Sequence, residues 1–486
     1  MRDRFTAIII VLLAFSIRLG GILSQSLWRD EVDAVLFASA PLKEVLGYFT
    51  HPGWNGPLYY LLLKGWLHLA GKGEFALRYF SLLFGVLSLP LIFKLAQNFL
   101  PERFALMAML LSGLSPYLVW YSQEGKMYGL WLFLATLAFF LHLRALERGG
   151  LKRWALYLMA VTANFYVHFH SLFMILGQLT LYLWPEYHKK WREGLLAHSI
   201  LILPFWPATR WLILSFFSPN PTGFPYYPLS DMFGILFTGW SCGILSTLWP
   251  WSLVPAGLTA LGALAEGKIA LRLGAILLLP VLGLFGVCLR KPLFTDRYLI
   301  FLAPFFYILL SLGLSFWRAK KKFLEPGLIL ALLLVNAEAL LSQSRFPIKS
   351  DFREAVALFK KYASEGDVVV FQIPYVRRVF DYYLAGEKPY IPVEAPYTNW
   401  GMTPKQVDSY LKSHTGYHRR VWLVLSEAEM WDSRGLVEKW FEENFTPELR
   451  GRLVRVTITL YSRPEPLVDL RALRYRCFLP LVLRQK

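Results

Sequence analysis

Charged residues are scarce over most of this 486-residue chain. Residues 1–348 hold 45 of the 84 Asp, Glu, Lys and Arg residues, about 13% of those positions, whereas residues 349–486 hold the other 39, about 28%. Hydrophobic residues make up 56% of the chain, and its mean hydropathy is +0.41. This composition excludes a disordered chain, a fibrous repeat and an ordinary soluble enzyme. It predicts a membrane body over 1–345 and a polar α/β domain over 346–486.

Cysteines and nucleotide-binding motifs are also scarce or missing. The three cysteines, Cys242, Cys288 and Cys477, have no metal-ligand spacing and form no even-numbered framework. No G-x-G-x-x-G and no P-loop occurs, so nucleotide binding is not expected. The net charge of +18 divides into +13 in the membrane body and +5 in the C-terminal part, and an excess of Lys and Arg in cytoplasmic loops is normal for a membrane protein. Because no compact basic patch with interleaved aromatics is visible, no nucleic-acid partner is expected.

Apolar runs long enough to cross a bilayer recur along residues 1–345. A spanning helix needs about 20 apolar residues for a hydrocarbon core of about 30 Å. The first run, Thr6 to Leu23, follows a short charged start and precedes no small-residue cleavage site, which favours a retained helix over a signal peptide. About eleven spans are expected, at 6–23, 76–97, 104–121, 127–146, 154–169, 171–185, 195–215, 245–265, 270–289, 298–317 and 323–343.

One apolar run is too short to span comfortably. Pro57 to Ala70 has 14 residues, about 21 Å as a helix, so we expect it to lie on the outer face with Lys64 and His68 turned toward water. Basic loop residues then fall on the cytoplasmic side, namely Arg103; Arg144, Arg148, Lys152 and Arg153; Lys189, Lys190 and Arg192; Lys268 and Arg272; and Arg318, Lys320, Lys321 and Lys322. This pattern predicts a multi-pass protein of the inner (plasma) membrane with a cytoplasmic N-terminus and an extracytoplasmic C-terminal domain.

The C-terminal part alternates helix and strand. Asp351-Phe-Arg-Glu354 is a capping-box pattern that opens a helix. Strand-like runs follow at 367–373, 421–425 and about 453–461, with a second helix near 433–445. The alternation predicts a small α/β layer domain with a recognition or lid role.

Polar clusters stand at the ends of the expected spans, on the side assigned as outer. Trp28-Arg-Asp-Glu-Val-Asp33 carries paired carboxylates, which suit a general base beside a group that orients a metal or a substrate hydroxyl. A charged collar where the first helix leaves the lipid is the alternative. A second cluster runs from Ser115 to Tyr128. Its hinge presents Gln123, Glu124 and Lys126 together, although a plain Glu–Lys pair closing a tight turn explains it as well.

A third cluster, Phe294-Thr-Asp-Arg-Tyr298, places Arg297 on the same side, where its planar fork of donors suits a phosphate headgroup. Snorkelling of a lone Arg is the alternative. His168 and His170 end the fifth span on this side. Because positions i and i+2 do not share a helix face, a two-histidine metal site on that helix is not expected, and one of the pair is a candidate for a cavity.

Four segments occur in the order Leu27-Trp-Arg-Asp-Glu31, Gly56-Pro-Leu-Tyr-Tyr60, Tyr121-Ser-Gln-Glu-Gly-Lys-Met-Tyr128 and Asp296-Arg-Tyr298. This order resembles the bacterial GT-C glycosyltransferases related to protein O-mannosyltransferases and aminoarabinose lipid A transferases. The resemblance covers the whole membrane body. The C-terminal domain resembles the extracytoplasmic α/β domain of many bacterial members, as in Asp351-Phe-Arg-Glu-Ala and Gly366-Asp-Val-Val-Val.

The resemblance implies a polytopic α-helical membrane enzyme of GT-C-like fold that takes a sugar from a polyprenyl-phosphate carrier. The family's catalytic Asp falls on Asp30, followed by Glu31, and its late Arg-Tyr pair falls on Arg297 and Tyr298, expected near the lipid phosphate. The family's Gln-Glu-Ala-Arg-x-Tyr reads Gln123-Glu-Gly-Lys-Met-Tyr128 here, so that Lys126 replaces an Arg and loses its fork.

A further family motif departs more strongly. The usual His- or Lys-Pro-Pro before Leu-Tyr-Tyr reads Asn55-Gly-Pro57, which lacks the cation; His51, four residues upstream of Asn55, is the candidate to replace it. The residues expected to bind the donor lipid phosphate are Arg297, Lys126, Tyr298 and Tyr128. Further cavity candidates are Gln123, Glu124, His51, Asn55, Tyr59, His168 and His170.

These residues predict direct displacement with inversion at the anomeric carbon. Asp30 is expected to accept the proton of an acceptor hydroxyl, while Arg297 and Lys126 stabilise the departing polyprenyl phosphate. Glu31 orients Asp30 or a bound divalent cation, and the residue pattern leaves both open, with no cofactor otherwise indicated. The acceptor is a glycolipid, a protein or a wall polymer. The alternatives are a flippase or transporter for a lipid-linked or anionic solute, and a membrane-anchored binding protein whose C-terminal domain acts.

Overall fold

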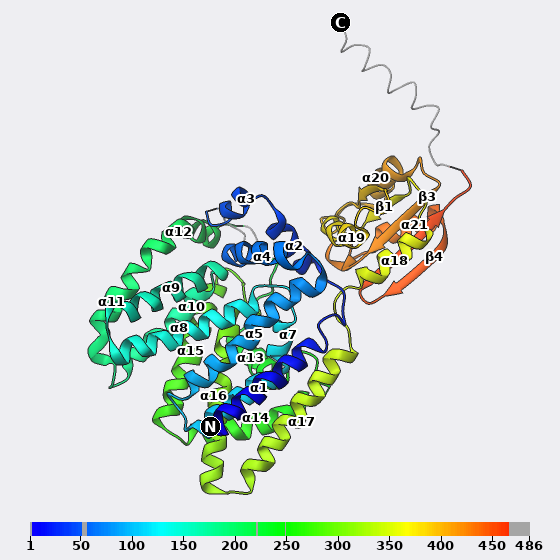
Figure 1. Ribbon diagram of the computed structural model, residues 1–486. Helices are drawn as coiled ribbons and strands as arrows, with labels where there is room; N and C mark the ends of the chain where they lie inside the picture. Colours follow the sequence, from blue (N-terminus) through cyan, green and yellow to red (C-terminus); the bar gives the residue numbers. More distant parts are fainter. Residues whose placement is uncertain (1, 51–55, 220–221, 248, 466–486) are drawn as a thin grey trace. The chain divides into compact units, whose positions relative to one another are not determined.

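The computed structural model describes residues 2–50, 56–219, 222–247 and 249–465 (Figure 1). The chain folds into two compact units. The first unit comprises the chain through Ser24 together with Ala34–Phe346. The second unit combines Gln25–Asp33 with the chain from Pro347 onward. A short segment near the N-terminus therefore folds with the C-terminal domain.

Helices make up the first unit, and α2 begins within the second. They are α1 (Arg2–Leu19), α2 (Arg29–Ser39), α3 (Leu42–Gly47), α4 (Pro57–Ala70), α5 (Glu74–Ala96), α6 (Glu102–Leu114), α7 (Pro116–Ser122), α8 (Tyr128–Arg148), α9 (Leu151–Val167), α10 (Ser171–Leu179), α11 (Trp191–Ile200), α12 (Ile202–Phe217), α13 (Leu229–Cys242), α14 (Trp249–Leu264), α15 (Lys268–Cys288), α16 (Ala303–Lys320) and α17 (Leu324–Arg345). Short 3-10 turns lie at Thr180–Leu183, His188–Lys190 and Asp296–Leu302.

Among the described residues, five helices are long and apolar enough to cross a membrane: Glu74–Ala96, Tyr128–Arg148, Lys268–Cys288, Asp296–Lys320 and Leu324–Arg345. Two bent pairs raise the count to seven if each is one span. The multi-pass architecture is thus confirmed, whereas the number eleven stays a prediction. Part of the difference arises because the apolar helices within the expected spans 171–185 and 245–265, Ser171–Leu183 and Pro250–Leu264, are shorter than 18 residues. Two further expected spans are broken. The expected span 104–121 bends by 57° between α6 and α7, and 195–215 bends by 55° at the α11–α12 junction.

Local chemistry explains where two of these helices begin and end. The Ser115 side chain accepts a hydrogen bond from the amide of Leu118, and Pro116 occupies the first position of α7, where a missing N–H costs nothing. This cap produces the bend that separates α7 from α6. At the far end of α8, Gly149 and Gly150 both have positive φ, which stops the helix before α9.

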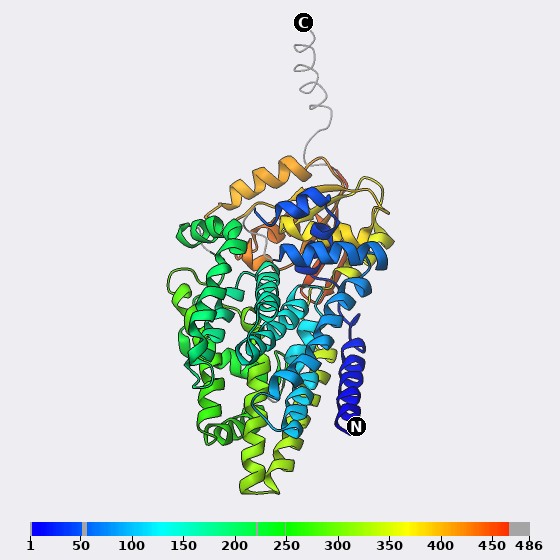
Figure 2. The ribbon, with the colours of Figure 1, turned by 60° about the vertical axis from the view of Figure 1, so that its left-hand side comes forward.

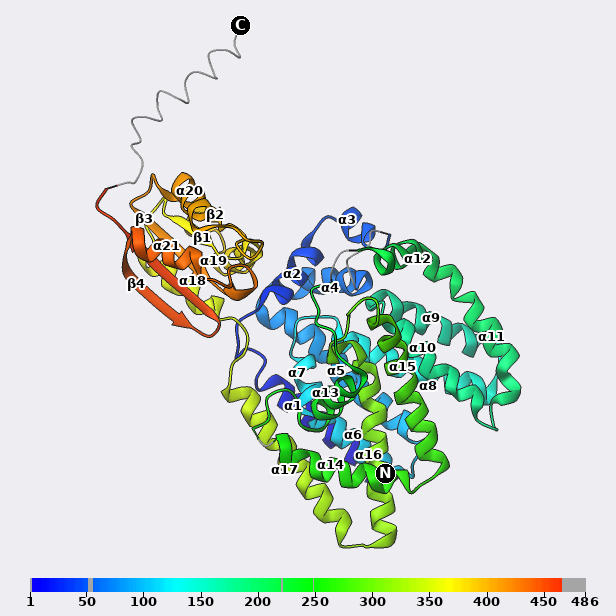
Figure 3. The same cartoon turned by 180° about the vertical axis from the view of Figure 1, so that it is seen from behind.

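The first unit packs its helices closely. Helix α5 lies against α8, and α8 against α9, while α14 lies against α16 (Figures 1 and 3). Figure 2 shows α1, in dark blue, along one side of the unit, where it contacts α5 and α6. Gly129 permits the α5–α8 approach, because a Cβ at that position would overlap the carbonyl oxygen of Ser81. The first turn of α8 is therefore held directly against α5.

A five-stranded mixed sheet forms the second unit. Its strands are β1 (Val368–Phe371), β2 (Ile391–Glu394), β3 (Arg420–Leu425), β4 (Thr446–Leu453) and β5 (Val456–Ser462), in the order β2-β1-β3-β5-β4. Strands β1, β2 and β3 run parallel, and β5 pairs antiparallel with β3 and β4. Its helices are α18 (Phe352–Tyr362), α19 (Arg377–Leu384), α20 (Pro404–Thr415) and α21 (Leu436–Asn444), with short turns at Pro374–Val376 and Ala428–Met430.

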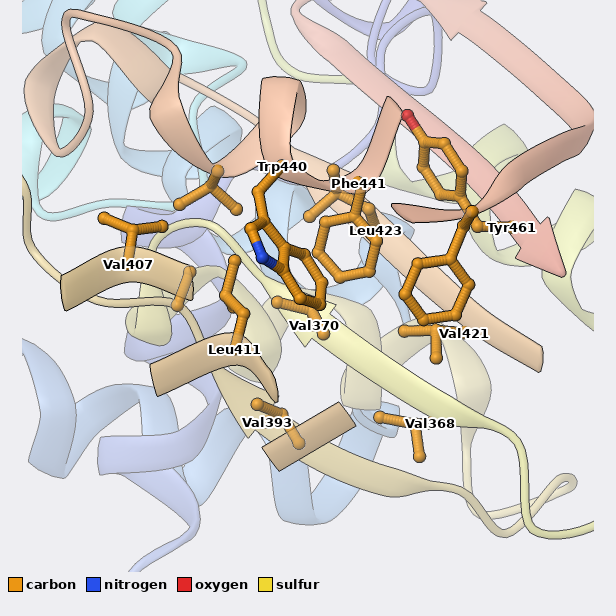
Figure 4. Packing of buried hydrophobic residues seen from close by; sticks show 13 residues of the cluster. Val368, Val370, Val393, Val407, Leu411, Val421, Leu423, Trp440, Phe441 and Tyr461 are labelled. Carbon is orange, nitrogen blue, oxygen red and sulfur yellow. The ribbon is translucent and has the colours of Figure 1, made fainter. Parts of the chain in front are cut away.

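Helices cover both faces of this sheet. Alternate residues of β1 and β3 point to opposite sides. Val368, Val370, Val421 and Leu423 pack with Trp440 and other residues of α20 and α21 (Figure 4). On the other face, Trp422 and Phe371 contact aromatic rings of α18 and α19. Because β1 leads into α19 on one face and β2 leads into α20 on the other, the strand order reverses between β1 and β3.

Some helices and strands of this domain were predicted from the sequence. The expected helix after Asp351 is confirmed as α18, with the Asp351 side chain accepting from the amide of Glu354. The strands expected at 367–373, 421–425 and 453–461 correspond to β1, β3 and β5, and the helix near 433–445 corresponds to α21. Helices α19 and α20 and strands β2 and β4 were not expected. The burial pattern explains the missed strand β2, of which only Val393 is buried, so that it lacks the alternation that predicts a strand.

Candidate functional site

Three connections of the first unit bring polar side chains together at one end of its helices. They are the α7–α8 turn at Gln123–Met127, the α9–α10 connection at His168–His170 and the 3-10 turn that begins at Asp296. The rings of His168 and His170 lie 4.9 and 4.5 Å from the ring of Tyr298, measured between centroids. Segments that are far apart in the sequence thus meet in one cluster.

Arg297 lies among aromatic rings in this cluster. Its guanidinium carbon is 5.8 Å from the centroid of the Tyr128 ring and 6.0 Å from that of Tyr298, within range of a cation–π interaction. The carboxylate of Glu124, which is only 1% exposed, attracts the same guanidinium. A buried guanidinium supplies a planar set of donors for an anionic ligand, while the carboxylate of Glu124 balances part of its charge.

Two tyrosines of α7 hold the residue before Arg297. The Tyr121 hydroxyl donates to the Asp296 carboxylate, with 2.9 Å between Tyr121 Oη and Asp296 Oδ2. The Tyr117 hydroxyl donates to the Asp296 main-chain carbonyl at 3.0 Å. Tyr117 and Tyr121 are four residues apart and share one helix face, and their rings lie 4.9 Å apart. They therefore fix the start of the 3-10 turn that carries Arg297.

The histidine pair is held by an aromatic stack. The indole of Trp131 lies parallel to the imidazole of His168, with 4.0 Å between centroids and 5° between planes. Trp131 Nε1 also donates to Ser171 Oγ at 2.8 Å. His168 Nδ1 accepts the backbone N–H of His170 at 3.2 Å. Within the described part of the chain, Nδ1 of His170 has no hydrogen-bond partner, so this imidazole keeps a ring nitrogen that can bind a ligand.

The α7–α8 turn contributes a second cation. Lys126 is 8% exposed, and the charges of Lys126 and Arg297 both act on His168. The hydroxyl of Ser81 donates to the Lys126 carbonyl at 2.7 Å, which fastens the turn to α5. Gln123 has a structural role instead, because its Nε2 donates to the Arg18 carbonyl at the end of α1 at 2.8 Å.

The N-terminus of α4 packs against the same connections. Gly56 has a φ of +79°, and a Cβ there would lie 2.9 Å from the Val167 carbonyl oxygen and 3.1 Å from Met127 Cε. Only glycine combines this backbone conformation with so close an approach. His51 and Asn55, which immediately precede this point, lie outside the described residues. Tyr59 is buried, with its ring 5.8 Å from that of Phe80.

Further along α4, one expectation is wrong. Lys64 does not turn toward water, because its ammonium donates to the carbonyls of Ala40 at 2.6 Å and Ala38 at 3.3 Å, near the C-terminus of α2. The negative end of that helix attracts the cation. His68 is exposed, as expected. Both side chains line an open groove of about 780 Å³ beside α4.

The acidic cluster belongs to the second unit. The Glu31 carboxylate is fully buried and pairs with Lys349, with 2.9 Å between Oε2 and Nζ. Asp33 pairs with Arg378 at 3.1 Å. Asp30 is half-buried and, among the described residues, forms neither a hydrogen bond nor an ion pair. Asp30 is therefore the carboxylate of this segment whose oxygens are available to a ligand.

Asp30 has an aromatic neighbour. Burial is the main cause that raises the pKa of the Tyr375 phenol. The negative charge of Glu427 raises this pKa further, and that of Asp30 does so to a smaller extent, whereas the guanidinium of Arg29 lowers it. The Arg29 guanidinium lies over the Tyr375 ring, 3.9 Å from its centroid. The phenol therefore stays neutral at ordinary pH and can donate a hydrogen bond.

The divalent cation considered at Glu31 has no matching set of ligands among the described residues. Among the described residues, no group of three or more His, Cys, Asp or Glu side chains is arranged to hold a metal ion. Glu31, the residue left open as a ligand, instead has the ammonium of Lys349 beside it, and its Oε2 also accepts the amide of Trp28 at 3.4 Å.

Several of these residues were not identified from the sequence. Trp131 and Tyr117 were not singled out, although the spacing of Tyr117 and Tyr121 signals a shared helix face. Lys349 could not be found by spacing, because 318 residues separate it from Glu31.

Comparison with known proteins adds a family match over part of the chain and a fold. Residues 50–219 match the dolichyl-phosphate-mannose-protein mannosyltransferase family. This stretch contains the α7–α8 turn, the histidine pair and the start of α4. No curated protein sequence matches the chain.

Solved structures resemble the chain over nearly its whole length. ArnT from Cupriavidus metallidurans in the apo state has 13% identity and a TM-score of 0.61, covering 95% of this chain and 98% of its own. ArnT from Cupriavidus metallidurans bound to undecaprenyl phosphate has 12% identity and a TM-score of 0.59, covering 93% and 97%. The archaeal oligosaccharyltransferase AglB from Archaeoglobus fulgidus, in complex with an inhibitory peptide and a dolichol-phosphate, has 11% identity and a TM-score of 0.52, covering 97% and 75%. The chain has the GT-C fold of these membrane proteins, as its motifs predicted.

Proposed function

We propose that the chain is an integral-membrane glycosyltransferase that moves a sugar from a polyprenyl-phosphate carrier to an acceptor outside the cytoplasm. The observation that carries the proposal is the placement of Arg297 with Lys126 among tyrosines where the helices end. At this position the two cations can bind the phosphate of a polyprenyl phosphate, and the apolar helices can pack against its hydrocarbon chain. ArnT, whose fold the chain shares, has been solved with undecaprenyl phosphate.

Arg297 and Lys126 are proposed to bind the phosphate of the donor. As the bond between the anomeric carbon and the phosphate oxygen breaks, the electron pair and negative charge move onto the phosphate. The Arg297 guanidinium, fixed by its neighbours on both sides, then stabilises the leaving group more than it stabilises the intact donor. Tyr128 and Tyr298 flank the guanidinium and keep water from its faces.

Asp30 is the proposed general base. The acceptor oxygen attacks the anomeric carbon from the side opposite the phosphate, and its proton passes to the Asp30 carboxylate, so the sugar is transferred with inversion. Within the described part of the chain Asp30 forms no ion pair, which supports this role, since a carboxylate tied to Arg or Lys is a weaker base. In the same segment, Glu31 and Asp33 each have such a partner.

The orientation of the protein in the membrane is inferred from the donor chemistry and from the charges of the loops. A lipid-linked sugar is a donor suited to the face where nucleotide sugars are not supplied. Basic residues such as Arg148 and Lys152 lie at the α8–α9 connection, at the opposite end of α8 from Tyr128. We therefore propose that the Arg297 cluster faces the outside of the cytoplasm, with the N-terminus inside.

Donor turnover by purified protein in nanodiscs tests this function. A panel of polyprenyl-phosphate sugars is offered with crude envelope acceptors, and released polyprenyl phosphate is measured. The wild type is expected to release it and Asp30→Asn is expected to bind donor without turnover. Asp231→Asn is the matched control, because Asp231 lies in the first turn of α13, as Asp30 lies in the first turn of α2, and its side chain is exposed. If neither the wild type nor the control consumes any donor, the enzyme assignment fails, and transport of a lipid-linked substrate is tested next.

A further inference from the structure

The acidic segment Gln25–Asp33 is bound along its length by the C-terminal domain. Gln25 Oε1 accepts the amides of Ile348 and Lys349 at 2.9 and 3.0 Å. The Ser26 hydroxyl donates to the Ser350 carbonyl at 2.7 Å. The backbone N–H of Leu27 donates to the Tyr383 hydroxyl. None of these bonds involves a carboxylate of the segment, so they hold its backbone independently of the ion pairs.

The segment reaches the edge of the sheet where the parallel strands end. Tyr375, which lies under the Arg29 guanidinium, follows β1 by four residues. Ser350, which holds Ser26, is 3.4 Å from Ser426 at the end of β3, measured between hydroxyl oxygens. The strand order reverses between β1 and β3, and open α/β sheets bind their ligands in the crevice at that position. Here the chain's own acidic segment lies at that edge.

Lys349 makes the central contact. Its side chain is 9% exposed and pairs with the fully buried Glu31. The same Glu31 oxygen accepts the amide of Trp28, three residues before it, which closes the first turn of α2 around Asp30. Lys349 Nζ also lies 5.9 Å from the centroid of the Trp28 ring. The conformation of the turn that carries Asp30 is thus tied to a lysine of the C-terminal domain.

Residues on both sides of Asp30 also form ion pairs or cation–π contacts. Arg378 of α19 pairs with Asp33 at 3.1 Å, and Arg29 pairs with Asp33 at 3.5 Å. Arg29 in turn stacks on Tyr375. The side chains on both sides of Asp30 therefore bind to the domain, while the Asp30 carboxylate has no such partner among the described residues.

We propose that the C-terminal domain serves to position the catalytic base. Its crevice at the ends of β1 and β3 holds Gln25–Asp33 as an internal ligand, and Lys349, Tyr375, Arg378 and Tyr383 are positioning residues that act through Glu31, Arg29, Asp33 and Leu27. This inference rests on the proposed function only in taking Asp30 as the base. Its structural content, that the domain orders the segment, stands apart from any reaction.

Amide hydrogen exchange of the full-length protein in nanodiscs tests the structural content. Lys349→Met removes the ion pair with the buried Glu31 carboxylate, and exchange over residues 25–33 is expected to rise at least tenfold. Lys349→Arg keeps the charge and is expected to stay within about threefold of wild type. Lys360→Met is the control, because it breaks another Lys–Glu ion pair, 2.8 Å from Lys360 to Glu387, that is exposed and lies away from the segment. Unchanged exchange over 25–33 in Lys349→Met would overturn the proposal.

Kinetics separate positioning from a general loss of stability. A misplaced base lowers the rate of the chemical step by an order of magnitude or more without weakening the donor complex. Lys349→Met is therefore expected to lower kcat at least tenfold with donor KM within twofold, and Lys349→Arg to restore most of the rate. A kcat within twofold of wild type for Lys349→Met would contradict the inference. If Lys349→Met does not fold, Tyr383→Phe, which removes the hydroxyl that accepts the Leu27 amide, is expected to lower kcat by a smaller factor, again with donor KM little changed.

The two measurements distinguish the possible failures. If no donor is turned over by any variant but exchange over 25–33 depends on Lys349, the proposed reaction is wrong and the ordering of the segment by the domain stands. If wild type turns over donor and neither exchange nor kcat depends on Lys349 or Tyr383, the reaction stands and the positioning role is wrong.

Discussion

The indole of Trp131 lies flat on the imidazole of His168, 4.0 Å away and within 5° of parallel. Trp131 is in the first turn of α8, four residues after Met127, whereas His168 ends α9. The stack therefore joins the turn that carries Lys126 to the connection that carries His170. A single contact between two rings sets the spacing of two candidate ligand-binding segments.

Replacement of Trp131 by Ala is expected to lower the unfolding free energy by about 3–5 kcal/mol, the usual range for a fully buried tryptophan. Thermal unfolding in detergent measures the loss. Trp400→Ala is the matched control, because that side chain is 88% exposed and its removal is expected to change stability by less than about 0.5 kcal/mol. Equal effects of the two substitutions would show that the stack contributes nothing to stability.

The donor site depends on the shape of Arg297 as well as on its charge. Arg297→Met is expected to lower kcat/KM by about 100-fold or more, because the leaving phosphate loses its main cation. Arg297→Lys keeps the charge but not the planar fork, and an intermediate loss is expected. Steady-state turnover with a polyprenyl-phosphate sugar measures both. Arg290→Met serves as the control, since Arg290 is exposed near the end of the same connection. Loss of activity in that control alone would argue against a specific phosphate site.

Tyr121 and Tyr117 provide a matched pair for the role of Asp296. Both hydroxyls donate to that residue, but Tyr121 bonds the charged carboxylate and Tyr117 the neutral carbonyl. A hydrogen bond to a charged group contributes about 1.5–3 kcal/mol and a neutral one about 0.5–1.5 kcal/mol. Tyr121→Phe is therefore expected to reduce kcat/KM more than Tyr117→Phe. The opposite order, measured in the same turnover assay, would mean that the Asp296 side chain does not help to orient Arg297.

Close packing of α5 and α8 predicts a cost for one added methyl group. Gly129→Ala would force a Cβ into the carbonyl oxygen of Ser81, and a loss of about 1–3 kcal/mol in stability is expected. Gly286→Ala in α15 is the control, because no atom outside its own helix lies within 4 Å of the added Cβ. That control is expected to be neutral or slightly stabilising, since alanine favours helix. Thermal unfolding in detergent compares the two, and equal losses would contradict the packing argument.

The C-terminal domain is expected to lose stability in acid partly through His418. Burial, and then the nearby Arg463, lower the pKa of His418 below its usual 6.5. The unfolded chain then binds a proton at a pH where the folded domain does not, so stability falls as pH drops below about 6.5. In His418→Asn, unfolding of the domain, followed by hydrogen exchange, is expected to depend less on pH between 7 and 5. An unchanged pH dependence would exclude His418 as a contributor.

Motif spacing singled out Arg297, Lys126 and Asp30 as candidates, because short motifs are local in sequence and each marks a helix end. The stack of Trp131 on His168 was not predictable in this way: His168 was singled out as a cavity candidate, but Trp131 has no feature in the sequence that separates it from the other apolar residues of its span. The pairing of Glu31 with Lys349 was less predictable still. Spacing arguments reach a few helical turns, and tertiary packing alone brings together residues 318 positions apart.

The expected number of spans illustrates a different limit. Hydropathy reports whether a segment is apolar, not whether its helix is straight. The cap at Ser115 and Pro116 bends the third expected span, and a second bend separates α11 from α12. The expected orientation of Lys64 was wrong for a related reason. An amphipathic pattern predicts which side of a helix is exposed, but it does not predict that the end of a neighbouring helix offers carbonyl oxygens to the side chain.

The pairing of Gln25–Asp33 with residues beyond Pro347 has a consequence for biosynthesis. During translation Asp30 emerges early, but the domain that holds its segment is made more than 300 residues later, after the helices of the first unit. Contacts this distant in sequence close last, since the loop between them must first be ordered. A ribosome that stalls or a protease that cuts after Phe346 therefore leaves a membrane-inserted body whose acidic segment has nothing to bind. Completion of the chain would then act as the step that switches the enzyme on.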